Sequence, residues 1–355
     1  MIEPGGTIGI LGGGQLGRMT ALAAASLGYR CHIFCPEHDS PAMQVTAAST
    51  VAPYEDETAL ARFADAVDIV TFEFENVPAA TAAFLAARKP LQPRPGVLAI
   101  CQDRLREKDF LGSIGVPTTR YRAIGGEDEL RRAVREIGPR SILKTARLGY
   151  DGKGQSSIDA TSDPAAIWGA ARTDRAILEA YVDFAREISV IVARGAGGIA
   201  AAYVPVENRH VHHILDTTVA PAAIDPALGA RADTLARDIA ARLDLVGILA
   251  VEMFVTRSGE LLINELAPRP HNSGHWTVDA CVTSQFEQLV RAICGLPLGS
   301  PERHSDAVMK NLIGADVASW REALDEPSAK LHLYGKSGAA PGRKMGHVTR
   351  LSPRS

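Results

Sequence analysis

Apolar residues gather in short runs that are separated by glycine turns and by segments with helical spacing. The run Thr7–Leu11 is followed by the turn Gly12–Gly17, by an alanine-rich helical segment and by a second run, Arg30–Phe34. This order predicts a strand, a helix and a parallel strand. A third run, Ile69–Phe74, follows another helical segment, so residues 1–100 are expected to form a Rossmann-like open parallel sheet.

The middle of the chain continues this mixture of elements, and the predicted fold class is α/β. The expected elements are a helix over 102–111, strands at 141–145, 176–182 and 187–192, a long helix over 230–243 and a strand hairpin over 248–266. Proline clusters near residue 93 and at 296–301 mark boundaries. We expect domains at 1–100, 101–295 and 296–355; the second contains a subdomain at about 120–182, and the third is small and rich in strands.

Composition and charge exclude several classes of protein. The chain has 355 residues, 46% of them hydrophobic, with 38 basic and 41 acidic residues and a formal net charge of -3. This balance provides no global field to attract nucleic acid or an anionic membrane. No leader is evident and no apolar run approaches about 18 residues, so we expect a cytoplasmic protein. The five cysteines lack paired zinc spacing, and we assign no metal or disulfide to them.

Two carboxylates interrupt the apolar hairpin at the end of the middle region. Glu252 lies within the first apolar run, and Glu265 lies in the run that returns after the polar link 256–259. Carboxylates this close stay ionised only beside a cation, and magnesium prefers hard oxygen ligands. The pair therefore predicts a magnesium site; the alternative is a partly exposed hairpin with unpaired acids. The pattern leaves open whether Glu265 or Asn264 lies beside Glu252.

The turn Gly12–Gly17 stands between a strand and a helix, where backbone N–H groups can approach an anion. Pro36 occupies the position at which an NAD-binding acid would lie, with only Glu37 after it. Three interpretations stay open: dinucleotide binding, a purely structural turn, and binding of a phosphate-bearing small substrate, which we favour. Gln15 could add a side-chain contact.

A second glycine-rich segment, Gly149–Gln155, follows the predicted strand that carries Lys144. Its glycines permit turns with positive φ, and Lys153 adds positive charge, so it is typical of a mobile phosphate cover. It does not match a P-loop, and the alternative is an ordinary flexible hairpin.

Three further groups of polar residues accompany the middle strands. Residues 179–182 are typical of a hinge that offers backbone groups to a purine, and Glu187 of an acid within reach of ribose hydroxyls, although each acid taken singly is more often a solvated strand end. His210, His212 and His213 are expected in one strand, and we favour His210 as a nucleotide neighbour over a metal ligand or a surface residue.

Taken together, these residues resemble the ATP-grasp fold in both type and order. Five segments resemble 5-(carboxyamino)imidazole ribonucleotide synthases of purine biosynthesis: GGGQLGRM at 12–19, FEFENVP at 72–78, GYDGKGQ at 149–155, HNSGHWT at 271–277 and PGRKMGH at 341–347. The resemblance spans nearly the whole chain. It implies a pre-ATP-grasp domain before the ATP-grasp domain, with the predicted subdomain as its lid.

The resemblance also implies an activity. ATP would phosphorylate bicarbonate to carboxyphosphate, which would carboxylate the exocyclic amine of 5-aminoimidazole ribonucleotide and release ADP and phosphate. Magnesium would be the metal, the substrates would be small molecules, and the protein would be a cytoplasmic homodimer that binds neither nucleic acid nor membrane.

The family motifs assign roles to residues of this sequence. The implied ATP contacts are Arg104, Lys144, Gly149, Tyr150, Asp151, Gly152, Lys153, Gly154, Gln155, Glu179, Ala180, Tyr181, Val182, Glu187, His210, Asn264 and Glu265. The implied magnesium ligands are Glu252 and Glu265. The implied catalytic residues are Tyr150, Asp151, Arg269, His271 and Lys336, and the implied substrate contacts are Gln15, Leu16, Glu73, Asn272, Ser273, Arg343 and Lys344.

The chain departs from the family pattern at Ala340, where an arginine commonly precedes the PGRK turn. Two other functions are compatible with parts of the pattern. A formate-using phosphoribosylglycinamide transformylase shares a glycine turn and a double-carboxylate hairpin but would lack the HNSGH run and the Tyr150–Asp151 pair. A non-catalytic nucleotide sensor would lack the magnesium acids, which are present here.

Overall fold

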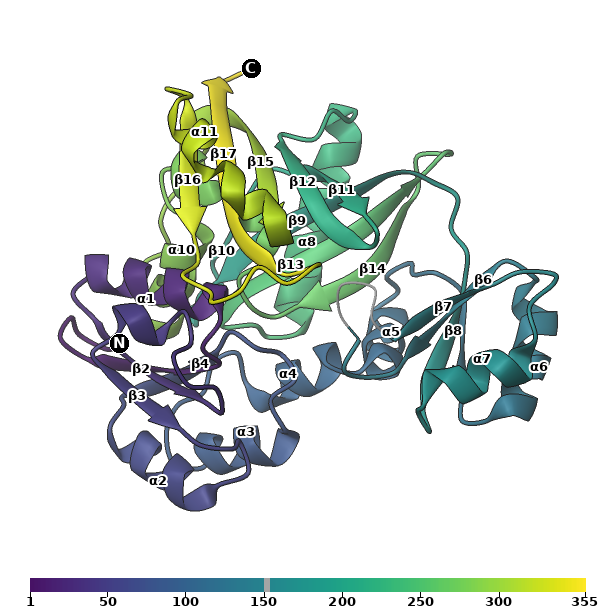
Figure 1. The fold of residues 1–355 in the computed structure, drawn as a ribbon, viewed down its shortest axis with the longest axis horizontal. Coiled ribbons are helices and arrows are strands. Elements are labelled where there is room, and N and C mark those ends of the chain that lie inside the picture. Colours follow the sequence, from purple (N-terminus) through teal and green to yellow (C-terminus); the bar gives the residue numbers. More distant parts are fainter. Residues whose placement is uncertain (150–153) are drawn as a thin grey trace.

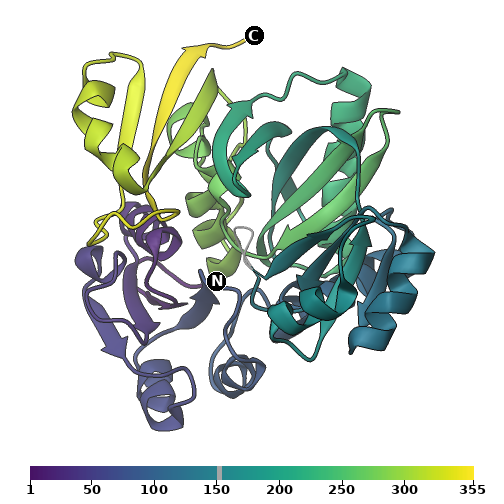
Figure 2. The same cartoon turned by 45° about the vertical axis from the view of Figure 1, so that its right-hand side comes forward.

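The computed structural model describes residues 1–149 and 154–355, and it contains three β-sheets (Figure 1). Among the described residues, no helix has the length and apolar character needed to cross a membrane. The N-terminal sheet and the C-terminal strands lie one above the other, whereas the sheet at the opposite end projects away from both (Figures 1 and 2).

The N-terminal sheet is parallel, with the strand order β3-β2-β1-β4. Its strands are β1 (Thr7–Leu11), β2 (Arg30–Cys35), β3 (Ala48–Val51) and β4 (Ile69–Phe72), and its helices are α1 (Gln15–Ser26), α2 (Glu57–Asp65) and α3 (Ala79–Ala86). The predicted open parallel sheet is confirmed. Strand β3 was not predicted, because its ASTV sequence is half exposed and carries little apolar signal, and β4 is two residues shorter than predicted.

A small antiparallel sheet, with the order β5-β8-β6-β7, forms the projecting part of the molecule (Figure 1). Its strands are β5 (Tyr121–Ile124), β6 (Ser141–Thr145), β7 (Gln155–Ile158) and β8 (Ala176–Ala180). Helices α6 (Glu127–Ile137) and α7 (Pro164–Ala171) pack against it around a core that includes Leu130, Leu143 and Leu178. The second glycine segment lies between β6 and β7 along the chain, and its last residue, Gln155, begins β7.

The largest sheet has the order β14-β13-β9-β11-β12-β15-β17-β16, with β10 paired to β9. Its strands are β9 (Phe184–Arg194), β10 (Ala200–Ala202), β11 (Val206–Val211), β12 (Ile214–Ala220), β13 (Gly247–Thr256), β14 (Leu261–Ala267), β15 (Ser305–Ile313), β16 (Ala329–Leu333) and β17 (Lys344–Pro353). Because β15 pairs with β12, the C-terminal strands extend this sheet. They are therefore joined to the middle region by backbone hydrogen bonds.

The remaining helices cover the large sheet and connect it to its neighbours. They are α4 (Pro95–Cys101), α5 (Arg104–Ser113), α8 (Pro226–Arg242), α9 (Thr277–Ala280), α10 (Gln285–Cys294) and α11 (Trp320–Leu324), with 3-10 turns at Met43–Val45, Asn272–Gly274 and Gly314–Ser319. The apolar side chains of α8 and α10 pack against β9 and β13 in two separate clusters, one on each side of the sheet. The predicted location of three histidines in one strand is wrong: His210 lies in β11, but His212 and His213 form the following turn, with positive φ values of 50° and 65°.

Candidate active site

The two carboxylates of the hairpin face each other across β13 and β14. Glu252 pairs with Glu265, whereas the next residue along β13, Met253, pairs with Ile263. Asn264 is therefore the extra residue of a β-bulge, which decides the register that the sequence left open. Without the bulge, neighbouring side chains of a strand would point to opposite faces. Here Asn264 and Glu265 are both partly exposed between the buried Ile263 and Leu266.

Cationic side chains surround Glu265. The Arg104 guanidinium lies 3.0 Å from its carboxylate and also donates to the carbonyl oxygen of Gly149 over 3.4 Å. Partial burial favours a raised pKa, but the charges of Arg104 and Lys144 outweigh it and hold the pKa of Glu265 at about 2. This carboxylate is therefore ionised at neutral pH.

Glu179, at the end of β8, forms a second carboxylate centre. One of its oxygens lies 2.6 Å from Lys144 Nζ, and the other lies 3.4 Å from Lys108 Nζ. Its side chain is 5% exposed. Burial acts to raise its pKa, but Lys144 and Lys108 lower it to about 2, so Glu179 is a buried anion held by two lysines.

The other predicted hinge residues are placed by backbone hydrogen bonds. The N–H groups of Ala180 and Tyr181 donate to the carbonyl oxygens of Arg120 and Arg140 over 2.9 and 3.1 Å. The Tyr181 ring is exposed and packs against the Arg140 guanidinium. These two N–H groups are used within the protein, and Val182 follows them in the link to β9.

Two histidines approach the carboxylates from neighbouring elements. His210 Nδ1 lies 2.6 Å from Glu187 Oε2, with the two residues on the adjacent strands β11 and β9. Burial lowers the pKa of His210, but the hydrogen bond and charge of Glu187 dominate and raise it. His271 Nε2 lies 3.0 Å from Glu252 Oε1, so the HNSGH segment reaches the carboxylate pair directly.

The N-terminal glycine turn has an internal anionic partner. Glu73 accepts hydrogen bonds from Gly14 N over 2.8 Å and from Gly17 N over 3.3 Å. A carboxylate therefore occupies the position at the start of α1 that we expected a substrate phosphate to take. Gln15 is partly exposed at the start of this helix, whereas the Leu16 side chain is buried against Phe286 and Tyr334.

The HNSGH segment and Arg269 are held by buried polar contacts. Arg269 lies 3.1 Å from Glu75, and Asn272 exchanges two side-chain hydrogen bonds with Asn311. Ser273 Oγ bonds to His271 and to Ser189. Asn272 and Ser273 are buried, so their contacts with the core hold the segment in place. His271 of the same segment lies at the carboxylate pair.

The C-terminal turn carries the remaining predicted cations. Lys336 Nζ donates to the carbonyl oxygen of Lys344 over 2.8 Å. The exposed Arg343 guanidinium donates to the carbonyl oxygens of Ser337 and Gly338, the latter over 3.1 Å. Ala340 is exposed and accepts from Arg343 N. Burial raises the pKa of Glu73, and the charge of Lys336 opposes this rise. Burial and, more weakly, Lys344 act to lower the pKa of His210, but Glu187 raises it.

The second glycine segment is only partly described. The predicted residues Tyr150, Asp151, Gly152 and Lys153 lie outside the described residues. At its edges, Gly154 has φ +72° and its carbonyl oxygen accepts from Thr145 N, while Gln155 pairs with Lys144 in the β6–β7 ladder.

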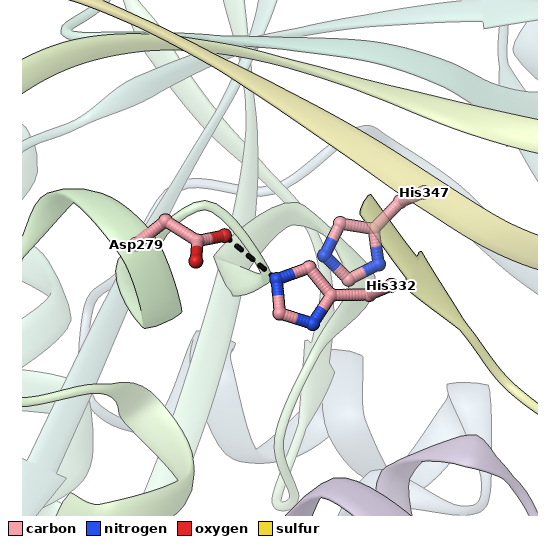
Figure 3. A group of neighbouring side chains, drawn as sticks. All are labelled: Asp279, His332 and His347. Carbon is pink, nitrogen blue, oxygen red and sulfur yellow. Dashed lines mark hydrogen bonds and ion pairs between the residues drawn. The ribbon is translucent and has the colours of Figure 1, made fainter. Parts of the chain in front are cut away.

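Two imidazoles and a carboxylate, those of His332, His347 and Asp279, lie close together beside the HNSGH segment (Figure 3). His332 Nε2 lies 2.8 Å from Asp279, and the His332 ring stacks on that of His347, with centroids 4.6 Å apart and planes inclined by 13°. His347 also hydrogen-bonds to Tyr334 and lies beside His275. Imidazole lone pairs lie in the ring plane, so two stacked rings do not direct them at one ion. The arrangement fits a packed contact between β16, β17 and this segment better than a metal site.

Comparison with known proteins decides the family. Three family models match successive parts of the chain: a ribonucleotide synthetase preATP-grasp domain at residues 6–102, an ATP-grasp domain at 109–286 and a phosphoribosylaminoimidazole carboxylase C-terminal domain at 307–355. An N5-carboxyaminoimidazole ribonucleotide synthase of Brucella melitensis is 50% identical over 100% of this chain and 98% of its own length. The corresponding protein of Bacillus subtilis is 43% identical over 98% of this chain and 92% of its own.

The chain belongs to the N5-carboxyaminoimidazole ribonucleotide synthase family. Solved structures agree with this assignment. An N5-carboxyaminoimidazole ribonucleotide synthetase in complex with ADP has a TM-score of 0.96 at 43% identity, covering 99% of this chain and 94% of that one. The Aspergillus clavatus synthase in complex with ADP and 5-aminoimidazole ribonucleotide has a TM-score of 0.92 at 30% identity, with the same coverage. The predicted α/β class and ATP-grasp fold are confirmed, and this family member is an enzyme.

Three charged residues that the structure places around this synthase site were not predicted. They are Glu75, which pairs with Arg269, and Glu107 and Lys108, which are buried beneath β14. Lys108 lies one helical turn after Arg104, in a helix whose Leu105 and Leu111 are buried. A lysine on the same face as buried leucines could have indicated a paired interior charge.

Proposed function

We propose that this chain is an ATP-dependent ligase that carboxylates 5-aminoimidazole ribonucleotide with bicarbonate, giving 5-(carboxyamino)imidazole ribonucleotide, ADP and phosphate in purine biosynthesis. Full-length similarity to N5-carboxyaminoimidazole ribonucleotide synthases carries this proposal. The paired carboxylates, with cations beside them, support it because phosphoryl transfer depends on positioning and charge neutralisation.

The oxygen atoms of the hairpin suit magnesium. Glu252 and Glu265 would hold the ion, and Asn264 Oδ1 is a buried acceptor without a hydrogen-bond partner among the described residues. This set of hard oxygen donors matches the preference of magnesium. When bound, magnesium would neutralise negative charge on the ATP phosphates.

The residues around the hairpin would bind different parts of ATP. Arg104 and Lys144 would contact the phosphates, and Glu187 with His210 would contact the nucleoside. The γ-phosphoryl group would pass from ATP to a bicarbonate oxygen, which forms carboxyphosphate and releases ADP. The exocyclic amine would then bond to the carboxyl carbon as the bond from that carbon to the phosphate oxygen breaks, and one proton would leave the amine.

Arg269 and His271 are proposed to hold the carboxyl group during this transfer. Both lie between the carboxylate hairpin and the N-terminal glycine turn: His271 contacts Glu252, and the charge of Arg269 lowers the pKa of Glu73 against the larger effect of burial. The residues proposed to contact the ribonucleotide are Gln15, Glu73, Asn272, Ser273, Lys336, Arg343 and Lys344. Leu16 would contact it only through its backbone, because its side chain is buried. A homodimer and a cytoplasmic location complete the proposal; light scattering and cell fractionation test them.

Omission assays test the function. Purified protein would be incubated with ATP, magnesium, bicarbonate and 5-aminoimidazole ribonucleotide, and phosphate release would be measured with each component left out in turn. We expect phosphate release to require the ribonucleotide and to be unaffected by added NAD. Phosphate release that depends on formate would favour the transformylase and contradict the proposal.

A further inference from the structure

The bulge that places Asn264 beside Glu265 leaves backbone groups outside the regular ladder. Glu265 pairs with Glu252 and Ile263 with Met253, so the peptide units around Asn264 do not follow the β13 repeat. Among the described residues, β14 is one of the two edge strands of the large sheet, and β16 is the other. Its outward-facing N–H and C=O groups need partners from another element, because buried backbone groups are rarely left unpaired.

Lys108 of α5 supplies partners for two carbonyl groups of the bulge. Its Nζ atom donates to Asn264 O over 2.8 Å and to Ile263 O over 3.1 Å. The Lys108 side chain is 1% exposed. An ammonium so deeply buried is retained only when charged or dipolar groups surround it. Here two adjacent carbonyl oxygens of the bulge do so.

Other groups hold the same stretch of β14 on both sides of this contact. Glu107 Oε2 accepts from Leu266 N over 2.8 Å, and the carbonyl oxygen of Pro117 accepts from Ile263 N over 2.9 Å. Together with Lys108, these contacts fix the backbone from Ile263 to Leu266. The proposed magnesium ligand Glu265 lies inside this stretch.

Lys108 also connects the bulge to the small antiparallel sheet. Its Nζ atom lies 3.4 Å from Glu179 Oε1, and the other oxygen of Glu179 lies 2.6 Å from Lys144 Nζ. Lys108 therefore stands between the strand with the proposed metal ligand and the strand that ends in the proposed nucleotide hinge. A single buried charge contacts both.

We propose that Lys108 is a positioning residue for the metal-binding hairpin: its ammonium holds the bulge in the register that points Asn264 and Glu265 into the site together. This inference rests on the proposed function for the identity of the metal and the nucleotide. It adds a residue that contacts neither of them. Loss of the Lys108 ammonium should weaken the affinity for the metal most and the affinity for the ribonucleotide least.

Lys108→Met tests the proposal because methionine keeps an unbranched apolar chain but removes the charge and the donors. Mn²⁺ binding to the ATP-bound full-length protein would be measured by electron paramagnetic resonance, alongside the magnesium and ribonucleotide half-saturation of phosphate release. We expect Mn²⁺ affinity to fall about tenfold, as for other residues that orient metal ligands, and the magnesium half-saturation to rise equally. The ribonucleotide half-saturation should change less than twofold.

Two conservative variants separate charge from hydrogen bonding. Lys108→Gln keeps N–H donors without charge, and Lys108→Arg keeps both, so metal affinity should increase in the order Met, Gln, Arg. If Lys108→Met does not fold, the comparison of Gln and Arg with the wild type still tests the proposal. Hydrogen exchange at Leu266 should accelerate in the same order as metal affinity is lost.

Arg237→Met is the matched control. Arg237 of α8 also donates to a strand carbonyl, that of Ala200 over 2.8 Å, and pairs with Asp233 away from the hairpin. It should change stability without changing Mn²⁺ affinity. Wild-type Mn²⁺ affinity and Leu266 exchange in folded Lys108 variants would overturn the proposal. Since Mn²⁺ binding needs no second substrate, failure of the omission assays alone would count only against the proposed function.

Discussion

At the scale of single residues, the site depends on carboxylates that stay ionised inside the protein. Glu265 has a pKa of about 2 because Arg104 and Lys144 overcome the effect of its partial burial. Glu179 has a similar pKa for the same kind of reason. We expect removal of the charge of Glu265 to affect catalysis, and removal of the charge of Glu179 to affect the stability of the fold.

Glu265→Gln should remove catalysis and leave the fold intact. Glutamine has nearly the same volume, but it loses the charge that Arg104 faces and that magnesium would need. We expect kcat to fall about a hundredfold or more, the scale of a misplaced reacting group. Glu260→Gln, an exposed acid in the same hairpin, is the control and should behave as wild type. Near-normal turnover of Glu265→Gln with unchanged magnesium dependence would refute the ligand assignment.

Glu179→Gln should lower stability in a pH-dependent manner. The folded-state pKa of about 2 lies below the ordinary 4.5, so the stabilisation is complete above pH 4.5 and disappears as the pH falls towards 2. The difference corresponds to roughly 3 kcal/mol at neutral pH. Urea unfolding of wild type and variant at pH 7 and pH 3 measures it; Glu136→Gln, on an exposed ion pair, is the control. A gap between wild type and variant that stays constant with pH would contradict this account.

At the scale of elements, the N-terminal turn couples β1, α1 and the segment after β4. Gly12 has φ +105°, and a Cβ atom there would lie 2.6 Å from Glu73 Oε1. The turn therefore needs glycine both for its backbone conformation and for the close approach of the carboxylate that caps α1.

Gly12→Ala should destabilise the protein by about 1–3 kcal/mol, the cost of a strained backbone with a displaced neighbour. Gly96→Ala is the matched control, because Gly96 lies in α4 with open space around its Cβ position. It should stabilise by about 0.4–1 kcal/mol through the unfolded state. Thermal unfolding compares them, and equal melting temperatures for the two variants would show that Glu73 does not constrain the turn.

At the scale of the whole molecule, residues from all three sheets meet around the site. The C-terminal turn precedes β17, which pairs with β15, and His347 of β17 packs beside His275 of the HNSGH segment. Figure 3 shows His347 with its other neighbour, His332. Burial lowers the pKa of His347 and of His275 well below the ordinary value, so both imidazoles are neutral. The C-terminal turn is thus connected through β17 to the segment that carries His271.

Arg343→Ala should weaken ribonucleotide use while leaving ATP binding almost unchanged. Arg343 is exposed and hydrogen-bonded to two carbonyl groups of its own turn, and we propose that it binds the substrate phosphate. We expect the ribonucleotide half-saturation to rise about tenfold, or roughly 1.4 kcal/mol. Arg321→Ala, which removes an arginine stacked on Trp320, serves as the control. Unchanged ATP affinity, ribonucleotide saturation and thermal stability in Arg343→Ala would show that this cation is a surface residue.

The sequence alone predicted the features that depend on neighbouring residues. Alternation and glycine turns indicated the parallel N-terminal sheet, the 248–266 hairpin and the two carboxylates, because side-chain periodicity follows directly from strand and helix geometry. The resemblance then supplied the family, since its motifs are long and contiguous. The half-exposed strand β3 carried too little apolar signal to be found in this way.

Tertiary structure decided which distant groups meet. It selected Glu265 as the partner of Glu252 through a bulge at Asn264, brought Glu73 into the glycine turn, placed Lys108 beneath β14 and joined the C-terminal strands to the large sheet. These outcomes depend on pairing between segments that are far apart along the chain. Local periodicity is nearly the same for either register of a hairpin, and an isolated charge does not reveal its partner. The register and the charge partners are decided by packing and by the need to pair buried charges and backbone groups.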